Sequence, residues 1–385
     1  MTQPPADLKE LIVCSLEPWD EVWRRNQFFT DILLRRNPEL RVLFVEPPAD
    51  PMFDLQSRHA PTLPRLRKIS SDGRLRALRP LKPLPRKLGA IADRMIVAQV
   101  RCATRLLGLH RPVLWINDVT YAPLLCTTDW PSLYDVTDDW LLFDSQEREL
   151  ERLTRLDQLC LSLAEVVVVC STDLANSRGA LRSVQLIPNG VDVDHFRRPR
   201  SRPADLPKQP VAVYVGTLHD ARLDVGLVTE LANAFPSLTV ALIGPDALSG
   251  SSKARLEACP NVVALGSRPY RDVPGYLQHA DVVIVPHVVT PFTESLDPIK
   301  AYECLAIVTP TVATPVAGFR DLTDRLHVVK RETFVSQVGA TLGRPSDVAP
   351  PHDKPPDWYD RATMFEKALQ ESIRAGGRTG RRRSA

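Results

Sequence analysis

The sequence predicts an α/β protein with two Rossmann-like domains, each a parallel sheet covered by helices. Short apolar runs alternate with segments of helical pattern along the chain. Such continuous runs are typical of parallel strands, because helices cover both faces of their sheet. The 385 residues suffice for two domains of ordinary size, and a polar, proline-rich segment at 197–208 divides the runs into two groups.

Eleven apolar runs are predicted as strands. The first group comprises residues 11–14, 42–45, 113–116, 132–135, 166–169 and 185–188. The second group comprises residues 211–215, 239–243, 262–265, 282–285 and 311–313. Short hydrophobic strands that alternate with helices indicate βαβ units in both halves of the chain.

The predicted domain boundaries follow from this division. We expect an N-terminal Rossmann-like domain at 1–196, a linker at 197–208 and a C-terminal Rossmann-like domain at 209–345. A helical region is expected at 346–373. The last residues, 374–385, are basic and glycine-rich, which predicts a disordered tail.

Composition and cysteine usage exclude several classes of protein. The 44% hydrophobic and 25% charged residues are typical of a soluble globular protein. No run approaches the ~18 apolar residues of a membrane span, and the first ten residues lack the basic-then-apolar pattern of a signal sequence. The seven cysteines are scattered without C-x-x-C spacing, which indicates a reducing compartment, no disulfide framework and no structural zinc.

The most informative segment is 293–318, TESLDPIKAYECLAIVTPTVATPVAG. It predicts a loop, a helix with Asp297 as its N-cap and Pro298 at its first position, and a strand near residue 312. Lys300 and Glu303 are three residues apart and share one face of that helix. By themselves they are either a helical ion pair worth a few tenths of a kcal/mol or two groups of a ligand site.

Segment 293–318 resembles the donor-sugar signature of glycosyltransferases with two Rossmann-like domains, in particular the retaining group 1 enzymes of family 4. The resemblance implies the GT-B fold, in which two domains face each other across a cleft and a last helix, here predicted at 358–369, crosses back to the N-terminal domain. It also implies that Glu303 binds the ribose of a nucleotide-sugar and that Lys300 lies near a phosphate. Cys304 and Val308 stand where the signature has Tyr and Gly.

The resemblance extends to the rest of the donor site. A strand that ends in Gly216 lets backbone N–H groups approach a phosphate. Relatives often have Arg and Lys where this chain has Thr217 and Leu223, and Arg222 lies beside the second position. The loop after Gly266 is expected to hold the base through backbone groups. Each motif has a plainer alternative, a simple βα turn. The predicted donor-site residues are Gly216, Thr217, Arg222, Gly266, Ser267, Arg268, Ser295, Leu296, Asp297, Lys300 and Glu303.

The predicted acceptor site lies in the N-terminal domain. Segments 18–27 and 134–143 resemble the P-W-D-x-V-W-x-R-x-Q and Y-D-x-x-D-[DE]-x-x-x-F segments of one subgroup of the family. Acidic residues here follow predicted strands, at the end where open α/β sheets bind ligands. As alternatives to an acceptor site, the tryptophans could belong to the core at the start of a helix, and the acidic residues could cap turns. The predicted acceptor-binding residues are Trp19, Asp20, Trp23, Arg25, Asp118, Asp138 and Asp139.

The chemistry implied by the resemblance needs no enzyme nucleophile, because the leaving phosphate can act as the base for the incoming hydroxyl. It needs no metal where helix N-termini and basic side chains neutralise the leaving diphosphate. Catalytic roles are predicted for Arg222, Lys300 and Asp138. No cofactor is expected besides the donor substrate.

The segment from Arg65 to Arg111 holds 13 Lys and Arg residues against two aspartates, and residues 90–107 have the pattern of an amphipathic helix. It is either a solvated basic face or a docking surface for an anionic membrane or a lipid-phosphate acceptor, at roughly 1 kcal/mol per basic residue. The aromatic residues that a single-strand nucleic-acid binder interleaves with its cations are missing, so no nucleic-acid partner is expected.

The sequence therefore predicts a retaining, metal-independent hexosyltransferase. Its donor is a UDP- or GDP-linked sugar, and its acceptor is a hydroxyl of a glycan, a lipid-linked saccharide or a natural product. Two alternatives stay open: a nucleotide-sugar 2-epimerase of the same fold, and a catalytically inactive glycosyltransferase-like partner or scaffold. We expect a cytoplasmic protein, with a peripheral position on the inner face of the membrane as an option.

Overall fold

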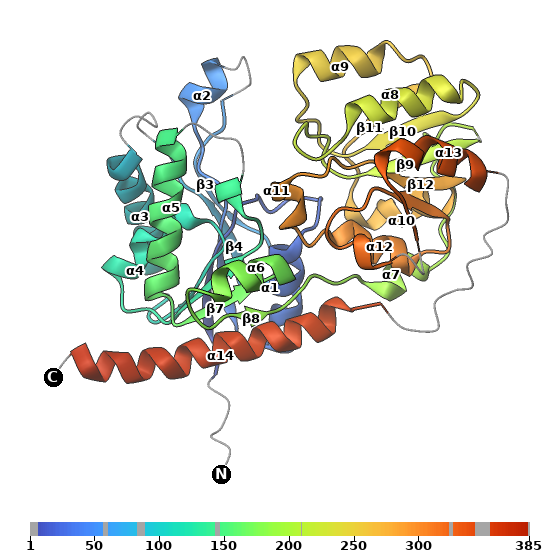
Figure 1. The fold of residues 1–385 in the computed structure, drawn as a ribbon. Helices are drawn as coiled ribbons and strands as arrows, with labels where there is room; N and C mark the ends of the chain where they lie inside the picture. The colour runs from blue at the N-terminus through green and yellow to red at the C-terminus, as the bar shows by residue number, and fades with distance from the viewer. Residues whose placement is uncertain are drawn as a thin grey trace. The chain divides into compact units, whose positions relative to one another are not determined.

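The computed structural model describes residues 7–56, 61–82, 89–142, 147–208, 210–322, 326–342 and 355–383. The chain divides into two compact units, each built around one sheet (Figure 1). Unit 1 comprises Met1–Asp20, Arg24–Pro188 and Tyr359–Ala385, and unit 2 comprises Glu21–Trp23 and Asn189–Trp358. These two α/β units confirm the predicted fold class. The division after Pro188 lies earlier than the predicted linker, because α7 (Val193–Arg197) buries Phe196 in the core of unit 2.

The sheet of unit 1 has the strand order β3-β4-β2-β1-β5-β6-β7-β8. Its strands are β1 (Glu10–Cys14), β2 (Arg41–Val45), β3 (Arg65–Lys68), β4 (Leu75–Arg79), β5 (Val113–Ile116), β6 (Ser132–Val136), β7 (Val166–Val169) and β8 (Gln185–Leu186). All neighbours are parallel except the edge pair of β3 and β4. The six predicted strands are present, whereas β3 and β4 are not among them, because their arginines read as a basic surface.

Alternate residues of each strand of unit 1 pack against helices on opposite faces of the sheet. One face packs on α3 (Gly89–Leu106), α4 (Pro123–Thr127), α5 (Glu147–Leu163) and α6 (Thr172–Gly179), whose apolar residues share a core with Ile12 and Leu114. On the other face, Trp115 contacts Phe29 of α1 (Arg25–Arg36). The short helix α2 (Pro51–Gln56) follows β2.

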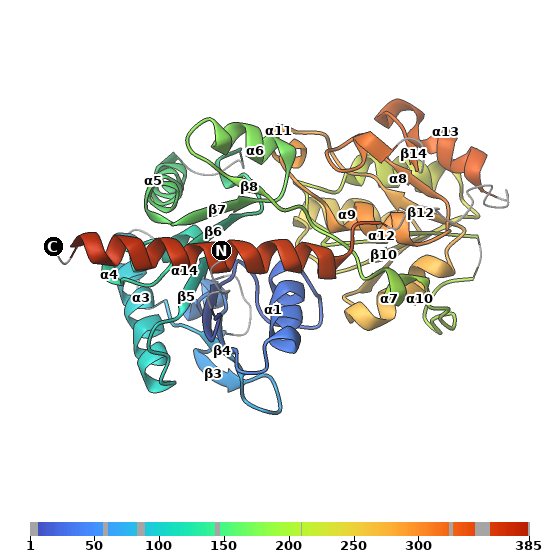
Figure 2. The same ribbon diagram turned by 90° about the horizontal axis from the view of Figure 1, so that it is seen from below.

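Helix α14 (Trp358–Arg383) returns the chain to unit 1, along which it runs in Figure 2. Its Phe365 ring lies 4.6 Å from that of Phe29 and 4.5 Å from that of Trp115. Asn37 donates a hydrogen bond of 2.8 Å to Glu366. The helix is longer than the predicted 358–369 and includes residues 374–383 of the predicted disordered tail.

The sheet of unit 2 is fully parallel, in the order β11-β10-β9-β12-β13-β14. Its strands are β9 (Val211–Val215), β10 (Thr239–Ile243), β11 (Val262–Gly266), β12 (Val282–Val285), β13 (Thr311–Ala313) and β14 (His327–Val328). The five predicted strands are present, and β14 was too short for a pattern to show it.

Helices cover both faces of this second sheet (Figure 1). One face packs on α8 (Val225–Ala234), α9 (Gly250–Glu257) and α13 (Arg331–Thr341), and the other on α7, α10 (Val273–Gln278) and α12 (Ile299–Ala306). The short α11 (Pro291–Glu294) precedes α12. This order brings the carboxyl ends of β9, β10 and β12 together, at the edge where open α/β sheets bind ligands.

Candidate functional site

Three glycines stand at the carboxyl ends of neighbouring strands in unit 2: Gly216 after β9, Gly244 after β10 and Gly266 at the end of β11. Gly216 N–H donates to Ile243 O at 2.9 Å, and Gly244 N–H donates to Gly266 O at 3.0 Å. Gly244 has a φ of +146°, and a Cβ atom there would overlap the carbonyl oxygen of Gly216. Only glycine allows this close backbone packing, which brings main-chain N–H groups to the ligand edge. Sequence reasoning missed Gly244, although a glycine directly after a predicted strand was the signal.

His287, which sequence reasoning also missed, links three strand ends. It follows β12, and its Nε2 lies 3.2 Å from the hydroxyl of Tyr214 on β9. Its N–H donates to Thr314 Oγ1 at 3.0 Å, and Thr314 Oγ1 donates back to His287 O at 2.7 Å. A Cβ on Gly216 would lie 2.7 Å from the Tyr214 hydroxyl. The buried imidazole therefore supports the turn that begins at Gly216.

Burial, together with the positive charges of Arg222 and Lys300, lowers the pKa of His287 to about 3. The imidazole is therefore neutral at pH 7. Val288 N–H donates to the carbonyl of Arg222 at 2.9 Å, which holds Arg222 beside the end of β12. Positive charge at this edge comes from the side chains of Arg222 and Lys300 rather than from the histidine.

The neutral His287 makes folding sensitive to acid. In the unfolded chain the imidazole takes up a proton near pH 6.5, but in the folded chain only near pH 3, so the unfolded state gains the proton first as pH falls. When the pH falls from 7 to 5, the free energy of unfolding of the wild type should decrease by about 2 kcal/mol more than that of His287→Gln. Urea denaturation of both proteins at both pH values measures this difference, and equal losses would contradict the prediction.

Segment 293–318 forms the end of α11, a loop, α12 and β13. The predicted N-cap of the helix is corrected. Pro298, not Asp297, is the N-cap of α12, and the helix begins at Ile299. The Asp297 carboxylate instead accepts hydrogen bonds from the Tyr302 hydroxyl at 2.7 Å and from Asn189 N–H at 2.5 Å. The predicted cap is wrong because these longer-range partners orient the side chain.

Lys300 and Glu303 form the ion pair that the sequence allowed, with Nζ 2.5 Å from Oε2. The Glu303 side chain is 4% exposed and that of Lys300 is 27% exposed. The pair thus places a carboxylate that can accept from hydroxyl groups beside an ammonium that can contact a phosphate. The pair is therefore compatible with a ligand site, and the ligand contacts themselves stay predictions.

The remaining predicted donor residues surround this edge. Ser295 and Leu296 are buried after α11, and Ser295 Oγ donates to Phe292 O at 2.7 Å. The Arg222 guanidinium lies 5.6 Å from the centre of the Phe292 ring. Thr217 accepts a long hydrogen bond, 3.4 Å, from the Tyr214 hydroxyl through its carbonyl.

The loop after β11 holds the last two predicted donor residues. Ser267 is exposed. Arg268 pairs with Asp205 and donates to the Tyr276 hydroxyl at 2.8 Å. The Arg268 side chain is directed to these partners, and contact of the backbone groups of this loop with a base stays a prediction.

The departures from the family signature have local physical explanations. Leu223 is 1% exposed in the core, so that position offers no cation, and the neighbouring Arg222 is the basic group of this turn. Cys304 lies on the face of α12 that is buried in the core. Val308 is 55% exposed between α12 and β13, so its branched side chain needs no room inside the protein.

Two predicted acceptor residues are held in buried ion pairs of unit 1. Arg25 is 4% exposed and binds Asp135 through two hydrogen bonds of 3.0 Å. Asp139 is 6% exposed and accepts from Arg178 at 3.0 Å. Both side chains therefore stabilise the strand ends around them, and direct contact of either with an acceptor stays a prediction.

The other predicted acceptor residues are divided between the two units. The Trp19 ring lies 5.1 Å from that of Phe44 in unit 1, whereas Trp23 belongs to unit 2 and stacks on Tyr270 at 6.0 Å. Asp118 caps a turn by accepting from Thr120 N–H at 2.8 Å, and burial raises its pKa. The two remaining acids are less buried: Asp20 pairs with Arg24 at 3.4 Å, and Asp138 accepts from Thr137 at 3.4 Å.

A buried amide network at the ends of β1 and β5 was missed. Asn26 Nδ2 donates to Asn117 Oδ1 at 2.8 Å and to Ser15 Oγ at 2.9 Å. Asn117 Nδ2 donates to Thr137 Oγ1 at 3.0 Å. Polar residues directly after predicted strands were the available signal. The network fixes the strand ends that carry Asp118 and Asp138.

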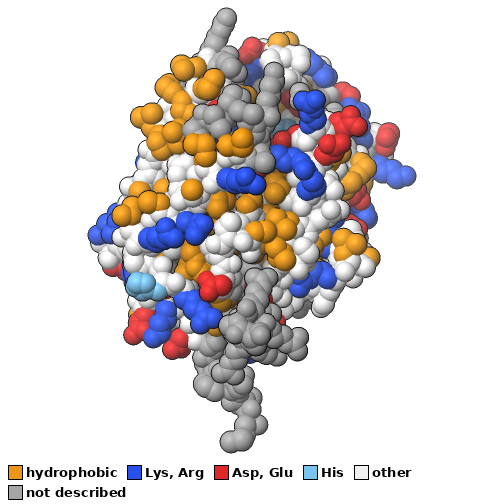
Figure 3. All heavy atoms as spheres, turned by 90° about the vertical axis from the view of Figure 1, so that its left-hand side faces the viewer, with side chains coloured by type: hydrophobic (Ala, Val, Ile, Leu, Met, Phe, Trp, Pro, Cys, Tyr) orange, Lys and Arg blue, Asp and Glu red, His pale blue; other side chains and the backbone are white. Residues whose placement is uncertain are grey.

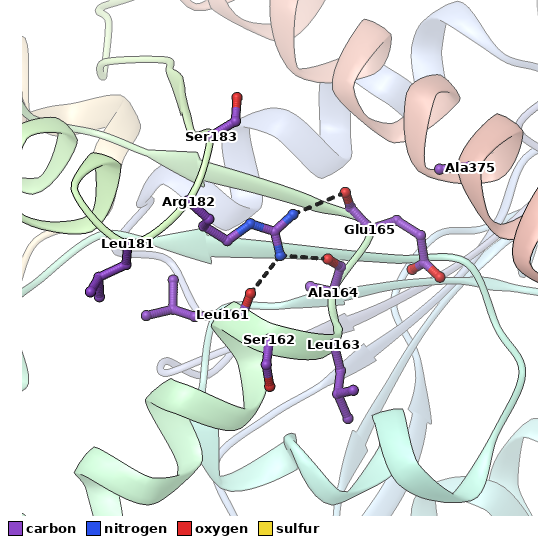
Figure 4. A pocket seen from close by; sticks show the side chains of 9 residues that line it. All are labelled: Leu161, Ser162, Leu163, Ala164, Glu165, Leu181, Arg182, Ser183 and Ala375. Atoms are coloured by element: carbon purple, nitrogen blue, oxygen red, sulfur yellow. Dashed lines mark hydrogen bonds between the residues drawn. The ribbon is translucent and has the colours of Figure 1, made fainter.

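The pocket in Figure 4 lies at the opposite, amino-terminal edge of the unit 1 sheet. Its Arg182 donates to Leu161 O and Ala164 O, at the end of α5. Glu165, just before β7, accepts from Ser132 N–H at the start of β6. Arg182 thus closes a helix end, and this pocket is separate from the ligand edge.

Comparison with known proteins finds a family match in the larger part of unit 2. The model of the family described as Glycosyl transferases group 1 matches residues 209–341. The putative teichuronic acid biosynthesis glycosyltransferase TuaH of Bacillus subtilis (strain 168) is 26% identical over 224 residues, which are 53% of this chain and 56% of that protein. The chain thus spans about half the length of this curated relative.

Several solved structures share the fold of nearly the whole chain. Anabaena HepE in complex with UDP and glucose has a TM-score of 0.61 at 16% identity and covers 98% of this chain and 100% of its own. The α,α-trehalose 6-phosphate synthase of Burkholderia multivorans has a TM-score of 0.60 at 12% identity, with coverages of 98% and 100%. The chain therefore has the GT-B fold that the sequence predicted, and its residues 209–341 match the model of the group 1 glycosyltransferases.

Proposed function

We propose that the protein is a glycosyltransferase that moves a hexose from UDP to a hydroxyl acceptor, with retention of configuration and without a metal. The observation that carries this proposal is the ligand edge of unit 2. It combines close-packed glycine backbone at three strand ends, the cations Arg222 and Lys300, and the nearly buried carboxylate of Glu303. The group 1 domain and the HepE complexes with UDP and UDP-glucose support this choice of donor.

Each residue has a distinct part in the proposed reaction. Glu303 accepts hydrogen bonds from the ribose hydroxyls, and Arg222 and Lys300 neutralise the charge that develops on the leaving diphosphate. The bond between the anomeric carbon and the phosphate oxygen breaks, and the acceptor oxygen bonds to that carbon. The acceptor proton passes to the leaving phosphate. Asp138 orients the acceptor hydroxyl.

Titration calorimetry with UDP and GDP tests the donor directly. We expect UDP to bind with measurable heat, because the basic groups and backbone N–H groups at this edge suit a diphosphate. Binding of GDP instead of UDP would mean that the base of the donor is guanine. Binding of neither nucleotide would overturn the proposed function.

The best candidate for a membrane-docking surface is α3, rather than the whole basic segment that begins at Arg65. Much of that segment is paired internally: Arg74 with Asp72, and Lys82 with Asp50. The outer face of α3, by contrast, exposes Ile91 at 52%, Met95 at 42% and Leu106 at 75%, together with Arg94 and Arg105.

The charge balance of α3 suits an anionic lipid surface. Asp93, its acidic residue, is turned inward and pairs with Arg152 at 2.9 Å. Figure 3 shows the side of the molecule on which α3 lies, where hydrophobic and basic side chains interleave. No helix of the described chain is long and apolar enough to cross a membrane. We therefore propose peripheral docking through the outer face of α3.

Sedimentation with vesicles of phosphatidylglycerol and phosphatidylcholine tests this docking. The double variant Ile91→Ser, Met95→Ser should bind severalfold more weakly than wild type, because it removes apolar area from the docking face. Leu181→Ser, which alters a leucine that is 67% exposed outside α3, is the matched control. Equal binding of both variants would contradict docking through α3.

A further inference from the structure

Three arginines of unit 1, Arg65, Arg67 and Arg79, surround the buried carboxylate of Glu46. We call these four residues the arginine cluster. Arg67 Nη2 lies 2.7 Å, Arg79 Nε 3.2 Å and Arg65 Nη2 3.5 Å from the oxygens of Glu46. Sequence reasoning placed all three arginines in a basic segment that was either a solvated face or a docking surface, and the neighbouring strands β3 and β4 bring them to one point.

Strand register explains this convergence. Arg65 is the antiparallel partner of Arg79, and Arg67, two residues further along β3, faces the small Ala77. Side chains two residues apart share a face of a sheet, so the three guanidinium groups lie on one side. Glu46 follows β2, and its N–H donates to Leu78 O at 2.8 Å, which sets it beside Arg79.

The cluster carries more positive charge than Glu46 can balance. Glu46 is 0% exposed, and although burial alone would raise its pKa, the hydrogen bond and charge of Arg67 and the charges of Arg79 and Arg65 lower it below its ordinary value. The carboxylate is therefore ionised at pH 7, one negative charge among three positive ones. Arg65 and Arg79 are like charges placed directly opposite each other, an arrangement that is unfavourable without a counter-ion.

The cluster also has hydrogen-bonding capacity that the protein does not use. Among the described residues, Arg67 Nε is buried without an acceptor. The side chain of Arg65 is 45% exposed and that of Arg67 is 33% exposed, so both can reach a molecule in solution. Guanidinium groups bind phosphate and carboxylate through paired N–H donors.

The position of the cluster ties it to the predicted acceptor segment. Trp19 N–H donates to Glu46 Oε1 at 3.2 Å, and Arg67 Nη2 donates to Trp19 O at 2.5 Å. β2 and β1 end side by side, where Ser15 N–H donates to Val45 O at 3.0 Å. The arginine cluster therefore lies at the carboxyl ends of the strands, on the same edge as Asp118 and Asp138.

We infer that the arginine cluster binds an oxyanion of the acceptor, a phosphate or a carboxylate. This inference rests on the proposed function and deepens it, because it assigns the acceptor to acidic saccharides and sugar phosphates rather than to neutral sugars. Glu46 holds the three guanidinium groups in place and leaves their excess charge for the ligand.

Calorimetry of the full chain with glucose 6-phosphate, glucuronate and glucose tests the inference. Wild type should bind one or both charged sugars at least tenfold more tightly than glucose, and the preferred one identifies phosphate or carboxylate as the group. Arg65→Ala should lower that affinity about tenfold, since it removes an exposed donor of the cluster. Arg76→Ala, on the other face of β4, is the matched control and should change it little.

A second variant should change the affinity for the charged sugar in the opposite direction. Glu46→Gln keeps the shape of the side chain but removes the competing negative charge, so affinity for the charged sugar should rise severalfold. Equal affinities for charged and neutral sugars, or an Arg65→Ala variant that binds like Arg76→Ala, would overturn the inference. UDP titrated into the same samples separates the outcomes: UDP binding without a preference for charged sugars refutes the cluster alone, whereas absent UDP binding refutes the proposed function.

Discussion

Replacing Arg25 with alanine should destabilise the protein by about 3–5 kcal/mol, the usual cost of removing one partner of a buried ion pair. Asp135 is 0% exposed, and its two oxygens each accept from Arg25 at 3.0 Å. The guanidinium also lies 4.7 Å from the centre of the Phe29 ring and 5.7 Å from that of Phe365. Alanine would leave a buried negative charge unbalanced between β6 and α1.

Urea denaturation followed by tryptophan fluorescence measures this loss. Arg35→Ala on the same helix is the control, because the Arg35 side chain is 63% exposed and its pair with Asp31 should contribute at most about 1 kcal/mol. Arg25→Lys keeps the charge but not the paired geometry, so its loss should be intermediate. If Arg25→Ala were as stable as Arg35→Ala, the buried pair would not carry the stability we assign to it.

Replacing Glu303 with alanine should weaken UDP binding by about tenfold to a hundredfold. Hydrogen bonds to a charged group contribute about 1.5–3 kcal/mol, and each 1.4 kcal/mol is about a factor of ten in affinity. The carboxylate is nearly buried, so water replaces its contacts poorly, and Lys300 loses the partner that holds it at 2.5 Å.

Titration calorimetry of the variant with UDP measures the change. Glu303→Gln, which keeps one acceptor oxygen, should lose less affinity than the alanine variant. Glu257→Ala alters an exposed acid at the end of α9 in the same unit and should bind UDP like wild type. An unchanged affinity in Glu303→Ala would refute the assignment of this residue to the donor nucleotide.

Most strands could be predicted because a buried parallel strand must be apolar on both faces, as in β7 with its four valines. Strands β3 and β4 could not be recognised in the same way. β3 is the edge strand and β4 lies next to it, and both strands carry arginines, so their pattern resembled a charged surface. The alternation of Arg and Leu at 65–67 was a signal of period two that a search for apolar runs overlooks.

The candidate donor site could be predicted in part because its groups lie within a short stretch of chain. Lys300 and Glu303 are three residues apart, so the helix alone brings them together. His287 and Tyr214 are 73 residues apart, and only the order of β9 and β12 in the sheet makes them neighbours. The role of His287 was therefore invisible in the sequence.

The sequence by itself determined most of the strands, the presence of two α/β domains and the shared helix face of Lys300 and Glu303, because apolar runs and helical spacing are local properties. Only the tertiary structure decided which charged residues are neutralised by a buried partner. Arg25 and Asp135, 110 residues apart, neutralise each other inside unit 1, whereas Arg65 and Arg79 converge on a single carboxylate. The charge available to a ligand depends on which partners folding brings within a few ångströms, and the spacing of residues along the chain does not contain that information.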